Sequence, residues 1–437
     1  MLIENEHRIG MSETARRTMI GVGDGDGIGH IHIAFVTVAD LPEGGGNTTR
    51  LKSLLQVLHR SGHRVRVWNE HALGVAPTQV LQPRGTVADA HYEFVLGSTE
   101  RRSGMASAGD KLSAVRAVTR NMLSARKAGA LDVLWFNNLS FYDVAPLTWL
   151  ARRNGIVTVQ AYEDERLEVV SRDGRSLSRR LFALNSRMAD RWCPRRADAV
   201  VTISTYLRTK YSSLVDDPDR VYLVPTIVSC DEWHLPEPPE EIEPHLLYVG
   251  AFGEQDDLAG IVDALALLND SSIPFRATFL GANQRDSHLV HDVVARIRDR
   301  GIEDRVRLRG FVPLEEVRRE IARSHVLLNI RRDAVWSRSG LSTKLSESLA
   351  SGRLVVTAAV GDVPHYLSDG ENALVVPAGA SARRIAEALS LACTNAELRR
   401  RVGAAGREVA RQQFDVAVHQ RTLDTVLTEA LHRRQSA

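Results

Sequence analysis

The feature of this sequence that most constrains its fold is the regular alternation of strand-like and helix-like segments in the second half. Short runs rich in Val, Leu and Ile recur there, with helical stretches between most of them. This alternation is typical of a parallel sheet with helices on both faces. The strand-like runs are "HLLYVGAF", "FRATFLG", "RVRLRGF", "VLLNI", "RLVVTAAV" and "NALVVPAG". We therefore expect a doubly wound α/β domain in the second half.

The first half begins with the same kind of unit. A buried strand is predicted over residues 31–40, followed by a glycine-rich turn, an amphipathic helix and the strand "HRVRVW". The 437 residues exceed the roughly 250–300 that one core supports. The Pro- and Glu-rich segment 235–244 is typical of a linker. We expect two Rossmann-like doubly wound domains facing a cleft, over 31–235 and 236–415, after a flexible tail over 1–30.

Composition excludes several classes of protein. The net charge of +2 and the 43% hydrophobic content argue against disorder and against a nucleic-acid partner bound through bulk charge. The 3 cysteines are scattered and odd in number, which indicates a reducing, cytoplasmic environment. No window approaches the roughly 18 apolar residues of a transmembrane helix. We expect a cytoplasmic protein.

A lysine at the start of a predicted helix marks the first candidate site. In "STKLSESLASG" the helix begins near Ser342, which places Lys344 in the first turn, where a cation opposes the helix dipole. A phosphate bound there would be attracted both by the lysine and by the positive end of the helix dipole. Glu347 lies on the same face, where its carboxylate can accept hydrogen bonds from a ribose. A surface Lys–Glu pair explains the same spacing. Arg331 and Arg338 precede the helix and add positive charge.

Two loops that follow predicted first-half strands supply further candidates. In "EGGGN", Gly45 and Gly46 allow close approach of a ligand to the backbone, and Asn47 begins the next helix. A flexible turn is the alternative for this loop. In "QAYEDERLE" the acidic side chains can hold an acceptor or stabilise a reacting sugar, although a solvated acidic loop has the same composition. The remaining candidates for hydroxyl binding at strand ends are Tyr162, Asn137 and Asn138.

No metal site or dinucleotide site is predicted. The tail sequence "GVGDGDGIG" misses the G-x-G-x-x-G spacing, and no strand precedes it. Asp256 and Asp257 open a predicted helix, where aspartate suits the dipole. The sequence contains no His/Cys/Asp cluster with metal-ligand spacing.

Residues 176–196 form a basic amphipathic stretch in which arginines alternate with apolar side chains. Such a stretch can contact an anionic membrane surface. A packed surface helix with solvated arginines is the alternative.

The segments "LYVGAF", "LRGFVPLEEV" and "STKLSESLASGRLVVTAAVGDVPHYLSDGENALVVPAG" resemble the GT-B glycosyltransferases, most of all the retaining family-4 type, over roughly residues 31–414. The resemblance implies that the chain moves a sugar from a UDP- or GDP-sugar to a glycan, lipid-linked or small-molecule acceptor, without a metal or a cofactor. It also implies that a final helix over 416–437 packs back on the first domain.

The resemblance assigns roles to individual residues. It places Lys344 beside the diphosphate, Glu347 beside the ribose, and the backbone of Phe311 and Val312 beside the base. The implied donor-binding set is Gly45, Gly46, Phe311, Val312, Arg331, Arg338, Lys344, Leu345 and Glu347. The implied acceptor-binding set is Asn47, Asn137, Asn138 and Tyr162, with Glu163 and Asp164 as the catalytic candidates.

The sequence departs from the family pattern at three places. Ser339 stands where many relatives have a glutamate, and the loop "GAFGEQDD" has no Arg or Lys. Glu163 and Asp164 stand where similar enzymes often carry a histidine–aspartate pair. These departures keep two alternatives open: a non-catalytic GT-B protein that binds a sugar nucleotide or an enzyme partner, and a different GT-B chemistry such as epimerisation or phosphorolysis.

Overall fold

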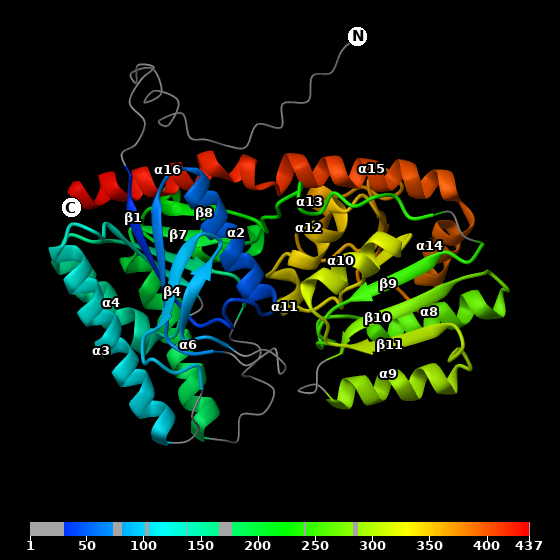
Figure 1. Cartoon of the computed structure of the whole chain (residues 1–437), viewed down its shortest axis with the longest axis horizontal. Coiled ribbons are helices and arrows are strands. Elements are labelled where there is room, and N and C mark those ends of the chain that lie inside the picture. Colours follow the sequence, from blue (N-terminus) through cyan, green and yellow to red (C-terminus); the bar gives the residue numbers. More distant parts are fainter. Residues whose placement is uncertain are drawn as a thin grey trace, which may run out of the picture.

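The computed structural model describes residues 30–72, 81–100, 105–137, 139–165, 177–239, 242–282 and 287–436. Residues 1–29 of the predicted tail and Asn138 lie outside the described residues. The described chain forms two α/β domains that lie side by side, with α15 (Ala396–Gln413) and α16 (Val416–Gln435) running along one edge of both (Figure 1). This arrangement confirms the predicted pair of doubly wound domains.

The first domain contains an eight-stranded sheet within the described residues, in the order β3-β4-β2-β1-β5-β6-β7-β8. Every pair is parallel except β3–β4. Its strands are β1 (His32–Thr37), β2 (Arg64–Asn69), β3 (Arg84–Val87), β4 (Ala90–Phe94), β5 (Val133–Asn137), β6 (Val157–Tyr162), β7 (Ala199–Thr202) and β8 (Val221–Leu223). Its helices are α2 (Gly46–Arg60), α3 (Met105–Lys127), α4 (Phe141–Arg153), α6 (Leu177–Arg196), α7 (Thr205–Ser212) and the 3-10 turn η1 (Pro218–Arg220).

Helices cover both faces of this sheet because its strands are apolar on both sides. The face that carries Phe35 and Trp135, whose rings stack at 5.1 Å, packs against α2 and α16. The opposite face packs against α3, α4 and α6. The β3–β4 hairpin was not predicted, because its short strands are partly exposed and polar. Its turn residues, Ala88 and Asp89, adopt positive φ without the usual Asn-Gly signal.

The second domain contains a six-stranded parallel sheet within the described part of the chain, in the order β11-β10-β9-β12-β13-β14. Each strand coincides with one of the predicted runs, although the strand at residues 276–282 extends one residue beyond its run. The strands are β9 (His245–Val249), β10 (Arg276–Ala282), β11 (Val306–Gly310), β12 (Val326–Asn329), β13 (Leu354–Ala358) and β14 (Leu374–Val376). The helices are α8 (Leu258–Asp270), α9 (Ser287–Asp299), α10 (Leu314–Arg323), α11 (Val335–Arg338), α12 (Thr343–Ala350), α13 (Val363–Tyr366), α14 (Ala382–Thr394) and α15 (Ala396–Gln413).

The chain passes between the domains twice, and the two connections lie side by side. The backbone N–H of Val228 donates to the carbonyl of Phe414 at 2.8 Å, and that of Val416 donates to the carbonyl of Val228 at 3.1 Å. Val228 and Trp233 already belong to the second domain's core, ahead of the predicted boundary at residue 236. The last helix, α16 (Val416–Gln435), then returns to pack against α2, β6 and β7.

Candidate functional site

A cleft of about 830 Å³ lies between the domains. Parallel sheets bind ligands beyond the carboxyl ends of their strands, and loops from those ends form both sides of this cleft. The first wall is the part contributed by the first domain, which includes Gly45, Gly46, Arg50, Lys111, Tyr142, Asp143, Glu163, Asp164 and Glu165. The second wall is the part contributed by the second domain, which includes Gly250, Gln255, Asp256, Phe311, Val312, Arg331, Lys344 and Glu347.

Helix α12 begins at the cleft, as the sequence predicted. Ser342 precedes its first residue, Lys344 lines the cleft, and Gly352 adopts a φ of +75° just beyond the end. Leu345 does not line the cleft: it is 2% exposed and packs in the core below the helix. The side chain of Leu345, which the resemblance placed in the donor-binding set, therefore does not face the cleft, because the apolar stripe that fixes α12 to the domain takes it inward, as its helical spacing indicates.

Lys344 is held by an aspartate. Its Nζ lies 2.8 Å from Oδ2 of Asp256, and the same oxygen accepts the Tyr248 hydroxyl at 2.6 Å. Burial alone would raise the pKa of Asp256, but the charge and hydrogen bonds of Lys344 and Tyr248 outweigh it, so the pKa lies below its ordinary value. The predicted helix does begin directly after Asp256 and Asp257, but the Asp256 carboxylate binds Lys344 and Tyr248 and does not cap the helix. Asp257 alone caps α8, accepting from Gly260 N.

Arg331 supplies the second cation of this wall, whereas Arg338 does not. The Arg331 guanidinium donates to Gln255 Oε1 at 2.6 Å and to the carbonyl of Gly340 at 2.9 Å. Burial lowers its pKa, although Asp256 and Asp164 act in the opposite sense. Arg338 pairs with Asp333 at 2.6 Å and is not among the cleft-lining residues, so its predicted place in the donor site is wrong.

Glu347 lies one turn deeper along α12 and also lines the cleft. Burial raises the pKa of this carboxyl to about 7, while the charges of Arg318 and Lys344 act to lower it. No group in the described part of the chain hydrogen-bonds to the carboxylate, so it is available to a ligand. Phe311 and Val312 also line the second wall, and Phe311 is 38% exposed.

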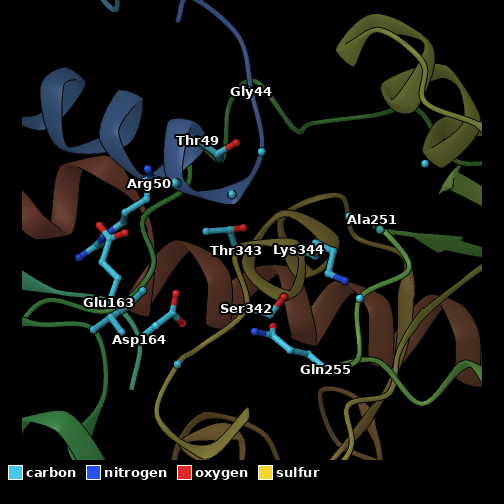
Figure 2. A pocket seen from close by; sticks show the side chains of 18 of the residues that line it. Gly44, Thr49, Arg50, Glu163, Asp164, Ala251, Gln255, Ser342, Thr343 and Lys344 are labelled. Atoms are coloured by element: carbon cyan, nitrogen blue, oxygen red, sulfur yellow. The ribbon is translucent and has the colours of Figure 1, made fainter. Parts of the chain in front are cut away.

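The glycine loop brings a second helix start to the same place. Gly45 and Gly46 line the cleft, and a side chain at Gly46 would lie 3.4 Å from the Thr343 hydroxyl. The starts of α2 and α12 therefore face each other, as Figure 2 shows for Gly44 and Thr49 opposite Thr343 and Lys344. Both helices present free N–H groups and the positive ends of their dipoles to one space. Asn47 lines the cleft and donates to the carbonyl of Val38 at 2.7 Å.

Glu163 and Asp164 line the first wall, on the opposite side from Lys344 (Figure 2). Beside Glu163 lies Arg50, which is 3% exposed, with Nε 3.9 Å from the carboxylate. The Arg50 guanidinium also donates to the carbonyls of Val224, at 2.6 Å, and Pro225. Burial lowers the Arg50 pKa to about 10. Sequence reasoning missed Arg50, although an arginine on the buried, leucine-rich stripe of α2 was a visible signal.

Two of the predicted acceptor residues lie away from the cleft. Asn137 is fully buried at the end of β5, and Tyr162 stacks on Tyr211 with ring centroids 3.8 Å apart. Neither is among the cleft-lining residues, which overturns their predicted role as direct ligands. Lys111 and Tyr142, which were not predicted, line this wall instead, with the Lys111 ammonium 4.5 Å from the centre of the Tyr142 ring.

Ser339 joins the two walls. Its hydroxyl accepts from the backbone N–H of Glu165 at 3.1 Å, and its carbonyl accepts from the hydroxyl of Ser204. Ser204 thus caps α7 and also contacts the other domain. Glu165 is in turn fixed by Lys210 at 2.7 Å. The serine that replaces the relatives' glutamate therefore makes an interdomain contact.

The described residues contain no group of three or more His, Cys, Asp or Glu side chains arranged to hold a metal ion. In the same part of the chain, no helix combines the length and the apolar character needed to span a bilayer.

Two family models match the chain, one on each domain. Residues 45–226 match the glycosyl transferase 4-like domain, and residues 243–395 match the glycosyl transferases group 1. No curated protein sequence matches significantly.

Solved structures share the whole two-domain architecture. Sucrose-phosphate synthase from Thermosynechococcus elongatus aligns with a TM-score of 0.71 at 18% identity, covering 92% of this chain and 100% of that one. Anabaena HepE in complex with UDP and glucose aligns with a TM-score of 0.66 at 15% identity, covering 91% and 100%. The catalytic domain of Arabidopsis thaliana starch synthase IV, bound to ADP and acarbose, aligns with a TM-score of 0.67 at 12% identity, covering 92% and 100%. At these identities the likeness shows the fold.

Proposed function

The protein is a glycosyltransferase of the GT-B fold, and we propose that it moves a sugar from a UDP- or GDP-sugar to an acceptor held by the first domain, with retention of configuration and without a metal ion. One observation carries the proposal. The starts of α2 and α12 face each other across the cleft, with Lys344 and Arg331 beside them and Glu347 one turn deeper. This arrangement suits a diphosphate followed by a ribose.

The diphosphate would lie between the two helix starts. N–H groups at a helix N-terminus bind anions, and the ammonium of Lys344 adds a mobile positive charge. Charge builds up on the leaving phosphate as the bond to the sugar breaks, so donors already aimed at that position lower the barrier. Lys344, Arg331 and the helix N–H groups would supply the stabilisation that a metal ion supplies in other transferases.

The nucleoside would follow along the second wall. The Glu347 carboxylate can accept hydrogen bonds from both ribose hydroxyls, and the apolar surface at Phe311 and Val312 lies beyond it for the base. UDP is present in HepE and ADP in starch synthase IV. The HepE likeness supports UDP as the first nucleotide to test.

The acceptor would contact the first wall. Its hydroxyl would attack the anomeric carbon on the face that the phosphate leaves, so the new C–O bond replaces the old one with the same configuration. The acceptor proton would pass to the departing phosphate oxygen, and no external base is then needed. Glu163 and Asp164 are placed to bind acceptor hydroxyls or to stabilise positive charge on the reacting sugar.

We also propose that a cytoplasmic enzyme reaches lipid-linked acceptors through α6. Leu184 and Met188 are 54% and 41% exposed, and they share an exposed stripe with Arg187 and Arg191. Apolar side chains flanked by arginines suit the surface of an anionic bilayer. Sedimentation with vesicles containing anionic lipid tests this, and loss of binding in Leu184→Ser/Met188→Ser is the expected result. Equal sedimentation of the wild type with neutral and anionic vesicles contradicts it.

The function itself is tested by binding and turnover. Melting temperature is followed with UDP, GDP and ADP, and the nucleotide that stabilises the protein identifies the donor class. Its sugar conjugates are then incubated with a panel of acceptors, and the anomeric configuration of the product is read by NMR. Turnover that survives a chelator supports metal independence. The absence of a thermal shift with every nucleotide contradicts the proposal.

A further inference from the structure

The loop between β9 and α8, residues 250–257, contacts both cations of the second wall although it contains no lysine or arginine. Asp256 Oδ2 accepts from Lys344 Nζ at 2.8 Å. The preceding residue, Gln255, accepts from Arg331 Nη2 at 2.6 Å through its side-chain oxygen. Two consecutive residues thus hold one cation each. This loop contributes acceptors to the donor site and leaves the positive charge to the loop and helix after β12.

The loop is itself fixed to the segment that follows β12. The backbone N–H of Arg332 donates to the carbonyl of Gln255 at 2.9 Å, and that of Asp257 donates to the carbonyl of Ile330 at 2.9 Å. The Asp256 side chain is 7% exposed and also accepts the Tyr248 hydroxyl at 2.6 Å. A carboxylate held by its own backbone and by a buried tyrosine cannot readily swing away. Its contact with Lys344 is therefore a fixed feature of the site.

This contact restricts a side chain that would otherwise sample many rotamers. A lysine that becomes ordered on binding loses rotamer freedom, and a partner that fixes it beforehand removes part of that cost. The ammonium has three N–H donors, and the Asp256 oxygen takes one of them. Lys344 also lies 5.3 Å from the centre of the Tyr248 ring and remains 30% exposed toward the cleft. Donors thus remain for a ligand.

We propose that Asp256 is a positioning residue that holds Lys344 toward the donor diphosphate, and that Gln255 does the same for Arg331. This inference rests on the proposed function, since a nucleotide diphosphate is the ligand. The opposite role for Asp256 is that of an internal anion, which occupies Lys344 in place of phosphate and competes with the donor.

The two roles predict opposite changes in diphosphate affinity when Asp256 is replaced. Asp256 places a negative charge next to a cation that would face phosphate, so on charge alone its removal strengthens diphosphate binding. If Asp256 positions Lys344, its removal weakens binding because the ammonium is no longer held in place. Asp256→Asn is nearly isosteric and retains an acceptor for the Tyr248 hydroxyl. It therefore changes the charge and the ion pair while leaving the volume of the buried site unchanged.

The experiment measures the dissociation constants of UDP and of uridine by calorimetry, or of another nucleotide and nucleoside pair if the thermal shifts select one. We expect Asp256→Asn to weaken UDP binding roughly tenfold and to leave uridine binding unchanged, because uridine has no phosphate for Lys344 to contact. Glu254→Gln is the matched control: it removes an exposed negative charge from the same loop at a residue that does not line the cleft. Unchanged or tighter UDP binding by Asp256→Asn overturns the proposal.

A double-mutant cycle with Lys344→Met attributes the effect to the pair. If Asp256 acts through Lys344, its substitution has little further effect on UDP binding once the lysine is absent. A full tenfold loss in that background also overturns the proposal. Gln255→Ala, at an exposed position, provides a second test that does not depend on the folding of a core variant, with an expected loss of roughly threefold for UDP and none for uridine. A wild-type protein that binds no nucleotide refutes the proposed function instead.

Discussion

The ion pairs of the two walls are arranged in opposite ways: on the second wall the cation Lys344 is more exposed than its partner Asp256, whereas on the first wall the carboxylate of Glu163 is more exposed than its partner Arg50. Lys344 faces the cleft with Asp256 buried beside it. On the first wall, Glu163 is the more exposed member of its pair with Arg50, and Glu165 lines the cleft whereas its partner Lys210 does not. The same ion-pair chemistry thus presents a cation at one side of the cleft and carboxylates at the other. A diphosphate fits the second wall, and a polyhydroxyl acceptor near a positively charged reacting sugar fits the first.

The largest effect is expected from removing the cation of the second wall. Lys344→Met should lower kcat by about 10²–10³, the range observed when one donor to a developing oxyanion is removed, and should leave the acceptor KM unchanged. Initial-rate kinetics with both substrates varied provide the measurement. Lys127→Met, an exposed lysine at the end of α3, is the matched control and should behave as wild type. If Lys344→Met raises the acceptor KM as much as it lowers kcat, the assignment of the donor to the second wall and of the acceptor to the first wall is wrong.

The first wall should respond in the complementary way. Asp164→Asn and Glu163→Gln each remove a carboxylate that would accept from acceptor hydroxyls, so the acceptor KM should rise by roughly tenfold or more. UDP affinity, measured by calorimetry in the absence of acceptor, should change by less than about twofold. Since Glu163 lies 3.9 Å from the buried Arg50, its variant is also checked for melting temperature. A loss of UDP affinity in Asp164→Asn would show that this wall also contacts the donor.

The two walls also differ in how far the sequence predicts them. The second wall is built from loops that follow a strand and lead directly into the next helix of the chain. The position of Lys344 in the first turn of α12 was therefore predictable from spacing. Its partner Asp256 lies 88 residues away, and no local pattern connects the two. Arg338 was wrong because spacing does not decide which side of a loop meets the ligand, and the spacing of Leu345 indicated the core rather than the cleft.

The first wall was less predictable for physical reasons. Arg50 contacts Val224 and Pro225 across 174 and 175 positions, and nothing near it in the chain indicates which buried carbonyls it meets. Asn137 and Tyr162 do end strands, as predicted, but side chains at strand ends alternate between faces, and these two point into the domain. The fold depends on short-range periodicity and was therefore predictable, whereas the site depends on long-range pairing.

Nucleoside binding at the second wall should depend on pH because of Glu347. Its folded-state pKa of about 7 lies above the ordinary value for glutamate, so the carboxyl is largely neutral at pH 6 and largely ionised at pH 8. If the ionised form accepts from the ribose, uridine affinity should rise roughly tenfold over this interval, and Glu347→Gln should remove the rise. Calorimetry at several pH values provides the measurement, and uridine is chosen because it has no phosphate that titrates in the same range.

The stability of the unliganded protein should change in the opposite direction. A carboxyl whose pKa is raised by folding contributes its full stability below the unfolded-state pKa and loses it as pH rises through the folded-state value. The wild-type melting temperature should therefore fall between pH 5 and 8 more steeply than that of Glu347→Gln. If the melting temperatures of the two proteins changed equally with pH, Glu347 would not titrate in this interval.

The smallest effect is expected where the walls meet. Ser339→Ala leaves the backbone N–H of Glu165 without its partner at a buried position, which should cost about 1–3 kcal/mol of unfolding free energy. Ser346→Ala is the matched control, because that buried hydroxyl donates to the carbonyl of Thr343 within the same helix. The melting temperature should therefore fall more in Ser339→Ala than in Ser346→Ala. UDP affinity should be the same in both, since neither hydroxyl lines the cleft. A loss of UDP affinity confined to Ser339→Ala would show that the donor senses the contact between the domains, so the two walls would then have to be treated as one site.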